Sequence, residues 1–326
     1  MRRKILKFIR NVALGLGAVF LGIWIYLAQP SFRSNDPAEL EVSETRLREV
    51  VQKLSVDFHP RNFRNTENLA RTAAYIEQHF RHAGGTVEIQ EFEVSGTNYH
   101  NVRCFFGDKE APRLVIGAHY DSHNQTPGAD DNASGVAGLI ELAYLFGRTN
   151  PPDCMELVAY PLEEPPFFAT ENMGSYIHAE SLSRENAPVR GMIALEMIGY
   201  FSNEPGSQKY PSLLLHLLYP SKGNFIAVAG NLSQRSYIAK VKAGMKGVTD
   251  LKVYSISAPR QLPGIDFSDH RNYWTFGYDA VMITDTAFYR NQAYHTANDT
   301  WDRLDYAKMA DVVRAVYNFA VQDPAR

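Results

Sequence analysis

The chain reads LVIGAHYD over residues 114–121 and PGADDNASG over residues 127–135. The first five of these residues form a continuous apolar run, which is typical of a strand that is buried on both faces. Two polar residues, His119 and Asp121, follow the run directly, and an apolar helix is expected over residues 133–146. This succession of strand, polar loop and helix predicts an α/β domain whose chemistry lies where the strands end.

Alternating strands and helices extend this unit in both directions. Apolar patterns and turn residues predict further strands at 87–94, 100–106, 155–162, 192–198, 225–229, 251–256 and 280–284. Capping residues and helical patterns predict further helices at 43–56, 66–82, 173–183, 233–246, 268–276 and 305–319. Residues 200–223 look irregular. The alternation predicts a three-layer α/β fold with a mixed sheet, and we expect one catalytic domain over residues 43–326 after a polar linker at 31–42.

Composition narrows the class of protein. The chain has 326 residues, of which 45% are hydrophobic and 21% charged, and these values exclude a disordered chain. Its net charge is −3, whereas proteins that bind nucleic acids usually carry an excess of basic residues, so we expect no nucleic-acid partner. This net charge combines two segments of opposite sign: the first ten residues contain five basic side chains, and the chain beyond residue 30 has a net charge of −8.

The first 30 residues are set apart from the predicted domain. A basic segment ends at Arg10, and residues 12–28 contain no charged side chain. Seventeen helical residues span about 26 Å, which is near the lower limit for crossing a bilayer. A cleaved signal peptide has a similar pattern, but residues 25–30 lack an A-x-A-like cleavage site. We therefore expect an uncleaved anchor with a cytoplasmic N-terminus and a periplasmic or extracellular catalytic domain.

Two cysteines, Cys104 and Cys154, cannot form a disulfide framework or a Cys-rich zinc site. Both flank predicted strands. An oxidising compartment would permit them to pair, and two separate buried thiols fit the sequence equally well.

Acidic residues and imidazoles gather where the predicted strands end. His119 and Asp121 are two residues apart and can point to the same side, so that the carboxylate could orient the imidazole. Asp130 and Asp131 stand together before the helix at 133–146. One acid would suffice to cap that helix, and two adjacent acids repel each other unless a cation or hydrogen-bond donors compensate.

Three further positions continue the pattern. Glu163 and Glu164 follow the strand at 155–162, and adjacent carboxylates at such a place suggest different tasks, one in metal binding and one in proton transfer. Glu196 lies within an apolar strand and needs an internal partner, because a buried unpaired carboxylate is costly. His295 lies in the loop before the last helix. Carboxylates with two imidazoles and no thiolate suit zinc, and an extra carboxylate suits a bridge between two ions.

Five ordered motifs carry a resemblance to a known family: HYD at 119–121, GADDNASG at 128–135, EE at 163–164, LEM at 195–197, and His295. The chain resembles the zinc aminopeptidases over residues 45–320. That family includes bacterial leucine aminopeptidases, glutamate carboxypeptidase II and, more distantly, the glutaminyl cyclases. The resemblance implies an α/β/α sandwich with a central mixed sheet of about eight strands and a co-catalytic pair of zinc ions.

The resemblance also implies roles for single residues. Five side chains would hold two zinc ions, namely His119 and Glu196 at the first ion, Glu164 and His295 at the second, and Asp131 as the bridge. Asp121 would orient His119, and Glu163 would act as the general base. The family usually has Asp at the position of Glu196, so the longer side chain alters the geometry at the first ion.

Two more features concern the surroundings of the expected site. An insertion at 165–173 separates the Glu pair from Gly174, and its residues Phe167 and Phe168 would either line the substrate site or pack in the ordinary way. His270 lies in a Ser-Asp-His segment that recurs in the family, and we expect it to be structural and not a ligand.

The function that follows is hydrolysis of N-terminal residues from peptide substrates. The alternative enzyme is a glutaminyl-peptide cyclotransferase with a single zinc ion, which the insertion after Glu164 weakly favours. A non-catalytic receptor-like ectodomain would be expected to have lost ligands, whereas every ligand position here carries a competent side chain. The sequence leaves the oligomeric state open.

Overall fold

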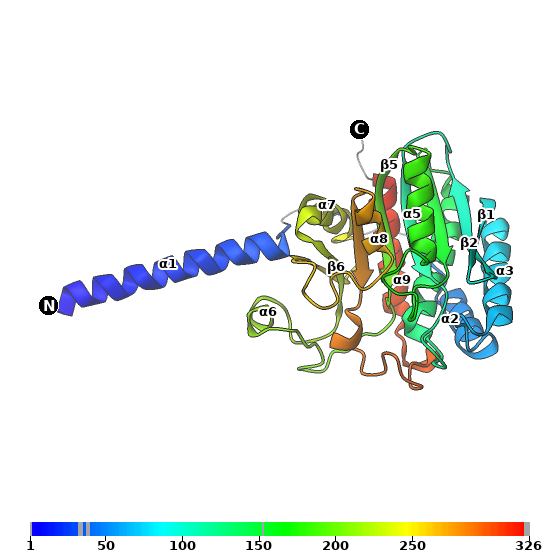
Figure 1. Ribbon diagram of the computed structural model, residues 1–326. Helices are drawn as coiled ribbons and strands as arrows, with labels where there is room; N and C mark the ends of the chain where they lie inside the picture. The colour runs from blue at the N-terminus through cyan, green and yellow to red at the C-terminus, as the bar shows by residue number, and fades with distance from the viewer. Residues whose placement is uncertain (1, 32–34, 37–39, 152, 323–326) are drawn as a thin grey trace.

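The computed structural model describes residues 2–31, 35–36, 40–151 and 153–322 (Figure 1). One mixed sheet of eight strands forms its centre, in the order β1-β2-β4-β3-β5-β8-β6-β7. The strands are β1 (Thr86–Val94), β2 (Thr97–Phe106), β3 (Arg113–His119), β4 (Cys154–Tyr160), β5 (Val189–Glu196), β6 (Phe225–Asn231), β7 (Lys252–Ala258) and β8 (Ala280–Thr284). The central strands β4, β3, β5 and β8 are parallel to one another, and so are β6 and β7. The pairs β1–β2, β2–β4 and β8–β6 are antiparallel.

Helices cover both faces of the sheet, as the sequence predicted. The α-helices of the described residues are α1 (Arg2–Ala28), α2 (Glu44–Gln52), α3 (Thr66–His82), α4 (Gly135–Thr149), α5 (Gly174–Arg184), α6 (Leu213–Leu218), α7 (Arg235–Met245), α8 (His270–Thr275) and α9 (Tyr306–Gln322). The larger apolar core packs α2, α3, α4, α7 and α9 against one face, and a smaller core packs α5 and α8 against the other. Strand β3 serves both cores, because Ile116 faces the larger core and Val115 the smaller.

The elements follow the predicted ones closely, with three differences. The helix expected over 43–56 is α-helical only to Gln52 and continues as a π-helix over Lys53–Asp57. The helix expected from residue 133 begins at Gly135, after a turn at Ala129–Ser134 that contains non-helical backbone. Residues 200–223 are not irregular throughout, because they contain the short helix α6.

Cys104 and Cys154 are free and buried. The register pairs Cys104 of β2 with Leu157 of β4, which is three residues from Cys154. Three strand residues span about 10 Å, and this exceeds the reach of a disulfide. Of the two alternatives that the sequence left open, the structure therefore has the two separate buried thiols.

Helix α1 leaves the rest of the structure and extends away from it (Figure 1). Its stretch Arg3–Ala28 is long and apolar enough to cross a membrane, and most of it is exposed. By length and composition it could be a membrane anchor or a signal sequence.

A buried ionic cluster ties β2, β3 and β4 together. Glu156 of β4 accepts hydrogen bonds from Arg103 Nε at 2.7 Å and from Arg113 Nη1 at 3.0 Å. His178 Nε2 lies 3.0 Å from the same carboxylate, and its Nδ1 lies 2.6 Å from the hydroxyl of Tyr273. Burial alone would raise the pKa of Glu156, but His178 and the two guanidinium groups lower it below its usual range.

We predict that Glu156→Gln lowers the free energy of unfolding by about 3–5 kcal/mol, because it leaves the buried Arg113 without its counter-charge and Arg103 with only the partly exposed Glu88. Urea unfolding of the full chain in detergent measures the change. The matched control is Glu180→Gln, which removes an exposed i,i+4 pair with Arg184 and is expected to cost about 0.5 kcal/mol or less. Equal losses in the two variants would contradict the importance of the cluster.

Candidate metal centre

The acidic and imidazole residues singled out in the sequence converge at one edge of the sheet. His119 is the last residue of β3 and Glu196 the last residue of β5. Glu163 and Glu164 follow β4, since the chain continues past Tyr160 at the same edge. Parallel strands bring their carboxyl ends together, so residues distant in sequence become neighbours.

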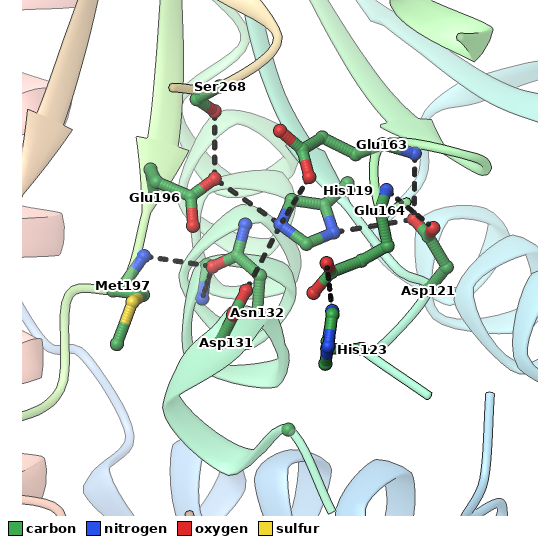
Figure 2. A network of polar contacts seen from close by, with 12 residues as sticks. His119, Asp121, His123, Asp131, Asn132, Glu163, Glu164, Glu196, Met197 and Ser268 are labelled. Carbon is green, nitrogen blue, oxygen red and sulfur yellow. Dashed lines mark hydrogen bonds and ion pairs between the residues drawn. The ribbon is translucent and has the colours of Figure 1, made fainter. Parts of the chain in front are cut away.

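A first group of possible ligands consists of His119, Asp131 and Glu196, all buried. His119 Nε2 lies 3.4 Å from Asp131 Oδ1 and 3.3 Å from Glu196 Oε2 (Figure 2). Glu196 is held in this position by Ser268, whose hydroxyl donates to Glu196 Oε2 at 2.7 Å. The longer side chain at position 196 therefore still reaches the group.

A second group consists of His123, Glu164 and His295. His295 Nε2 lies 3.4 Å from Glu164 Oε2 and 3.0 Å from Asp131 Oδ2. One oxygen of Asp131 thus faces each group. This arrangement suits a carboxylate between two ions, and the bridging role that the resemblance implies for Asp131 stays a prediction.

His123 was not expected from the sequence. Its Nδ1 lies 3.1 Å from Glu164 Oε2, and its ring stacks on His295 with centroids 3.8 Å apart and planes 8° apart. Asn124 Nδ2 lies 2.8 Å from His123 Nε2, and an amide nitrogen can only donate. When Nε2 accepts from Asn124, the neutral ring carries its proton on Nδ1 and can donate it to Glu164. The spacing His119-x-Asp121-x-His123 was a signal that could have found this residue.

Two further carboxylates, those of Asp121 and Asp299, hold the loops that carry the acidic residues by accepting hydrogen bonds from backbone N–H groups. Asp121 accepts from the N–H of Glu163 at 3.2 Å and from that of Glu164 at 3.0 Å. Its Oδ1 also lies 3.3 Å from His119 Nδ1, in keeping with the predicted orienting role. Asp299 accepts from the N–H groups of Asp130 and Asp131 at 3.0 and 3.1 Å, a contact that the sequence did not reveal.

Glu163 points toward the first group from the side opposite Glu196 (Figure 2). Its Oε2 lies 3.9 Å from His119 Nε2. Burial raises the pKa of Glu163 well above its usual range, and the carboxylates of Glu196 and Glu164 add to the shift, while His119 opposes it. A carboxyl with a raised pKa is suited to proton transfer.

His270, by contrast, lies outside both groups. Its Nε2 lies 2.8 Å from the carbonyl oxygen of Ile265, and its ring packs edge-on against Trp274. The expected structural role agrees with these contacts. In the insertion, Phe167 packs against Phe63, while Phe168 packs against Phe267, a residue of the cavity described below.

The residues present fit a divalent cation. Four buried carboxylates meet here, those of Asp131, Glu163, Glu164 and Glu196. Among the described residues, His119 Nε2 and Glu164 Oε1 have no hydrogen-bond partner. Burial lowers the pKa of His295, but Asp131 and Glu164 raise it to about 10, so the acids draw a positive charge into the site. Imidazole and carboxylate donors in two groups that share one acid suit zinc.

An apolar cavity adjoins both groups. Glu196 of the first group lies in its wall, and so does Tyr294, whose ring stacks on His295 at 3.8 Å. The aromatic and aliphatic residues of the lining include Tyr210, Leu215, Tyr219, Phe225, Tyr254, Ile265, Phe267, Met282, Phe288 and Tyr289. The segment 200–223 thus contributes to the wall of the cavity beside the candidate metal centre.

Comparison with known proteins agrees with this geometry. Residues 101–320 match peptidase family M28. The uncharacterised protein YfbL of Escherichia coli is 47% identical over 306 residues, which cover 91% of this chain and 94% of that protein. Leucine aminopeptidase 1 of Ajellomyces capsulatus is 23% identical over 305 residues, which cover 86% of this chain and 72% of that protein.

Two solved structures share the fold. A glutaminyl cyclase of Bacteroides thetaiotaomicron has a TM-score of 0.66 at 18% identity, covering 88% of this chain and 99% of that one. A Zn-dependent exopeptidase of Parabacteroides distasonis has a TM-score of 0.65 at 17% identity, covering 87% and 100%. The chain belongs to peptidase family M28, as its motifs predicted. Membership implies a zinc-dependent hydrolase of the metallopeptidase class.

We predict that His123→Ala weakens zinc binding by about 10- to 100-fold, because Glu164 loses the donor that orients it. Competition with a chromophoric chelator measures the affinity without reference to activity. His216→Ala, which removes an exposed imidazole on α6, is the matched control. If both variants bind zinc as tightly as the unsubstituted chain, His123 does not support the site.

Proposed function

We propose that this protein is a co-catalytic zinc aminopeptidase. The observation that carries the proposal is the completeness of two ligand groups that share Asp131. His119 and Glu196 would hold the first zinc ion, and Glu164 and His295 the second. When bound, such ions lower the pKa of water and polarise a substrate carbonyl.

The chain's own residues account for the proton transfers. Glu163 lies beside both groups without belonging to either. Its carboxylate takes a proton from the attacking water and returns it to the departing amine. Asp121 holds the backbone of Glu163 and thereby keeps this carboxylate in place.

The cavity supports recognition of an amino terminus. Its lining contains the acid Glu196 and, among the described residues, no Lys, Arg or His. A C-terminal carboxylate would find no basic side chain there, whereas an ammonium group would find acceptors in the carboxylates of the centre and the tyrosine hydroxyls of the lining. The apolar lining further supports peptides whose first side chain is apolar.

The place of action follows from α1. We propose that α1 anchors the protein in a membrane, with the N-terminus in the cytoplasm and the catalytic part on the periplasmic or extracellular side. The basic start of the chain supports this orientation.

We predict that Glu163→Gln lowers turnover of short peptides by about 10²- to 10⁴-fold and leaves bound zinc unchanged, because the amide cannot accept the proton. Turnover is followed as release of free amino acids, and zinc by elemental analysis of the same sample. Glu171→Gln, an exposed acid in the nearby insertion, is expected to behave as the unsubstituted chain. An active Glu163→Gln protein would remove Glu163 from the role of base.

The second candidate is a glutaminyl-peptide cyclotransferase. The similarity to a bacterial glutaminyl cyclase over nearly its whole length favours it, and so does the completeness of the second group by itself. A non-catalytic ectodomain has no such support, because none of the ligand positions is lost.

Metal content separates the two enzymes. For the aminopeptidase we predict about two zinc ions per chain, and about one after Glu196→Gln, which removes a ligand of the first ion only. Peptide hydrolysis should be lost together with that ion. A single ion in the unsubstituted chain, with ammonia release from peptides that begin with Gln, would instead establish the cyclotransferase.

A further inference from the structure

The C-terminal end of α1 is fastened to the sheet and to α7. Lys242 Nζ donates to the carbonyl oxygens of Ala28 at 2.7 Å and of Gln29 at 3.1 Å. Ser255 of β7 donates to Ala28 at 2.8 Å. The last carbonyls of a helix have no partner within it and carry partial negative charge, so a lysine and a hydroxyl stabilise this end.

Helix α6 presents leucines to the outside. Leu213 and Leu217, which lie on one face of the helix at i and i+4, are 77% and 67% exposed. Leu215 points the other way, is 5% exposed and lies in the wall of the cavity. Large apolar side chains with this exposure next to one another indicate a surface that another apolar phase covers.

The same serine connects α6 with α1. Tyr219, directly after α6, donates from its hydroxyl to the carbonyl oxygen of Ser255 at 2.7 Å. The hydroxyl of Ser255 in turn binds the end of α1. Figure 1 shows that α6 reaches further than the other labelled elements around the sheet in the direction in which α1 extends.

We propose that α6 inserts Leu213 and Leu217 into the surface of the lipid bilayer that α1 crosses. The proposal rests on the anchor function proposed for α1. The surface that covers it is the boundary between headgroups and acyl chains, because α6 lies on the side of the sheet toward which α1 extends. Two exposed lysines, Lys209 and Lys222, flank the segment in sequence and suit anionic headgroups.

This placement has a consequence for the substrate. Tyr210, Leu215 and Tyr219 are part of the cavity wall, so the cavity lies directly beneath the membrane-facing helix. The peptidase would therefore act on peptides whose amino termini are held at the bilayer surface, such as those that leave the membrane or carry an apolar first residue.

The experiment uses the full chain reconstituted in vesicles of phosphatidylcholine and phosphatidylglycerol. Leu217→Cys and Leu213→Cys are each labelled with the fluorophore NBD, and doxyl-labelled lipid is added as a quencher. Val56→Cys, also an exposed apolar position but on the π-helix after α2, is the matched control. The unsubstituted chain gives the background from its buried cysteines.

We expect a blue-shifted emission at positions 213 and 217 and about twofold quenching by the doxyl lipid, because the groups lie within the interface. Position 56 should show neither effect. A blue shift without quenching would place another protein over α6 and overturn the proposal, as would emission like that at position 56. Flotation of the vesicles tests the anchor separately. A chain that does not float with the vesicles is bound to the membrane neither by α1 nor by α6, and this would overturn both proposals. None of these readouts depends on zinc or turnover, so they are independent of the proposed activity.

Discussion

Mutual repulsion among four buried carboxylates is the constraint on which the rest of the site depends. Asp131, Glu163, Glu164 and Glu196 come from separate segments and meet in a place from which water is largely excluded. Such a cluster is stable only with positive charge between its members. The parallel strands provide the convergence, and the two groups that share Asp131 show where cations would provide the charge.

The surrounding residues hold this cluster in a fixed geometry. Asp121 and Asp299 each bind two consecutive backbone N–H groups of the acidic loops, and Ser268 fixes one oxygen of Glu196. The ligands are thereby oriented by neutral donors and not by competing cations. The longer side chain of Glu196 fits because the hydroxyl of Ser268 lies where it can donate a hydrogen bond to the carboxylate.

The strand ends could be predicted because an apolar strand followed by an unexpected charge is a strong local signal, and His119, Glu163 and Glu196 lie at such places. Asp131 precedes a helix and His295 lies in a loop, so their assignment as ligands depends on the resemblance to the zinc aminopeptidases. His123 could not be assigned with the same ease, since only the folded loop brings it over His295. Helix α6 has too few residues to show a helical period, and leucines on all sides hide its buried face. Whether Cys104 and Cys154 can form a disulfide depends on the register of β2 and β4, and the sequence pattern does not determine that register.

His295 lies between two rings, those of Tyr294 and His123, with centroid distances of 3.8 Å on both sides. Its backbone has a φ of 56°, in the left-handed region, and hydrogen bonds such as that from Thr296 N–H to the carbonyl oxygen of Ala293 at 2.9 Å hold the loop together with the stack. Rotation of the imidazole alone would break both stacking contacts. An ion bound there would therefore be released more slowly than from an unstacked imidazole, and this makes the rate of metal exchange depend on the neighbouring rings as well as on the ligand itself.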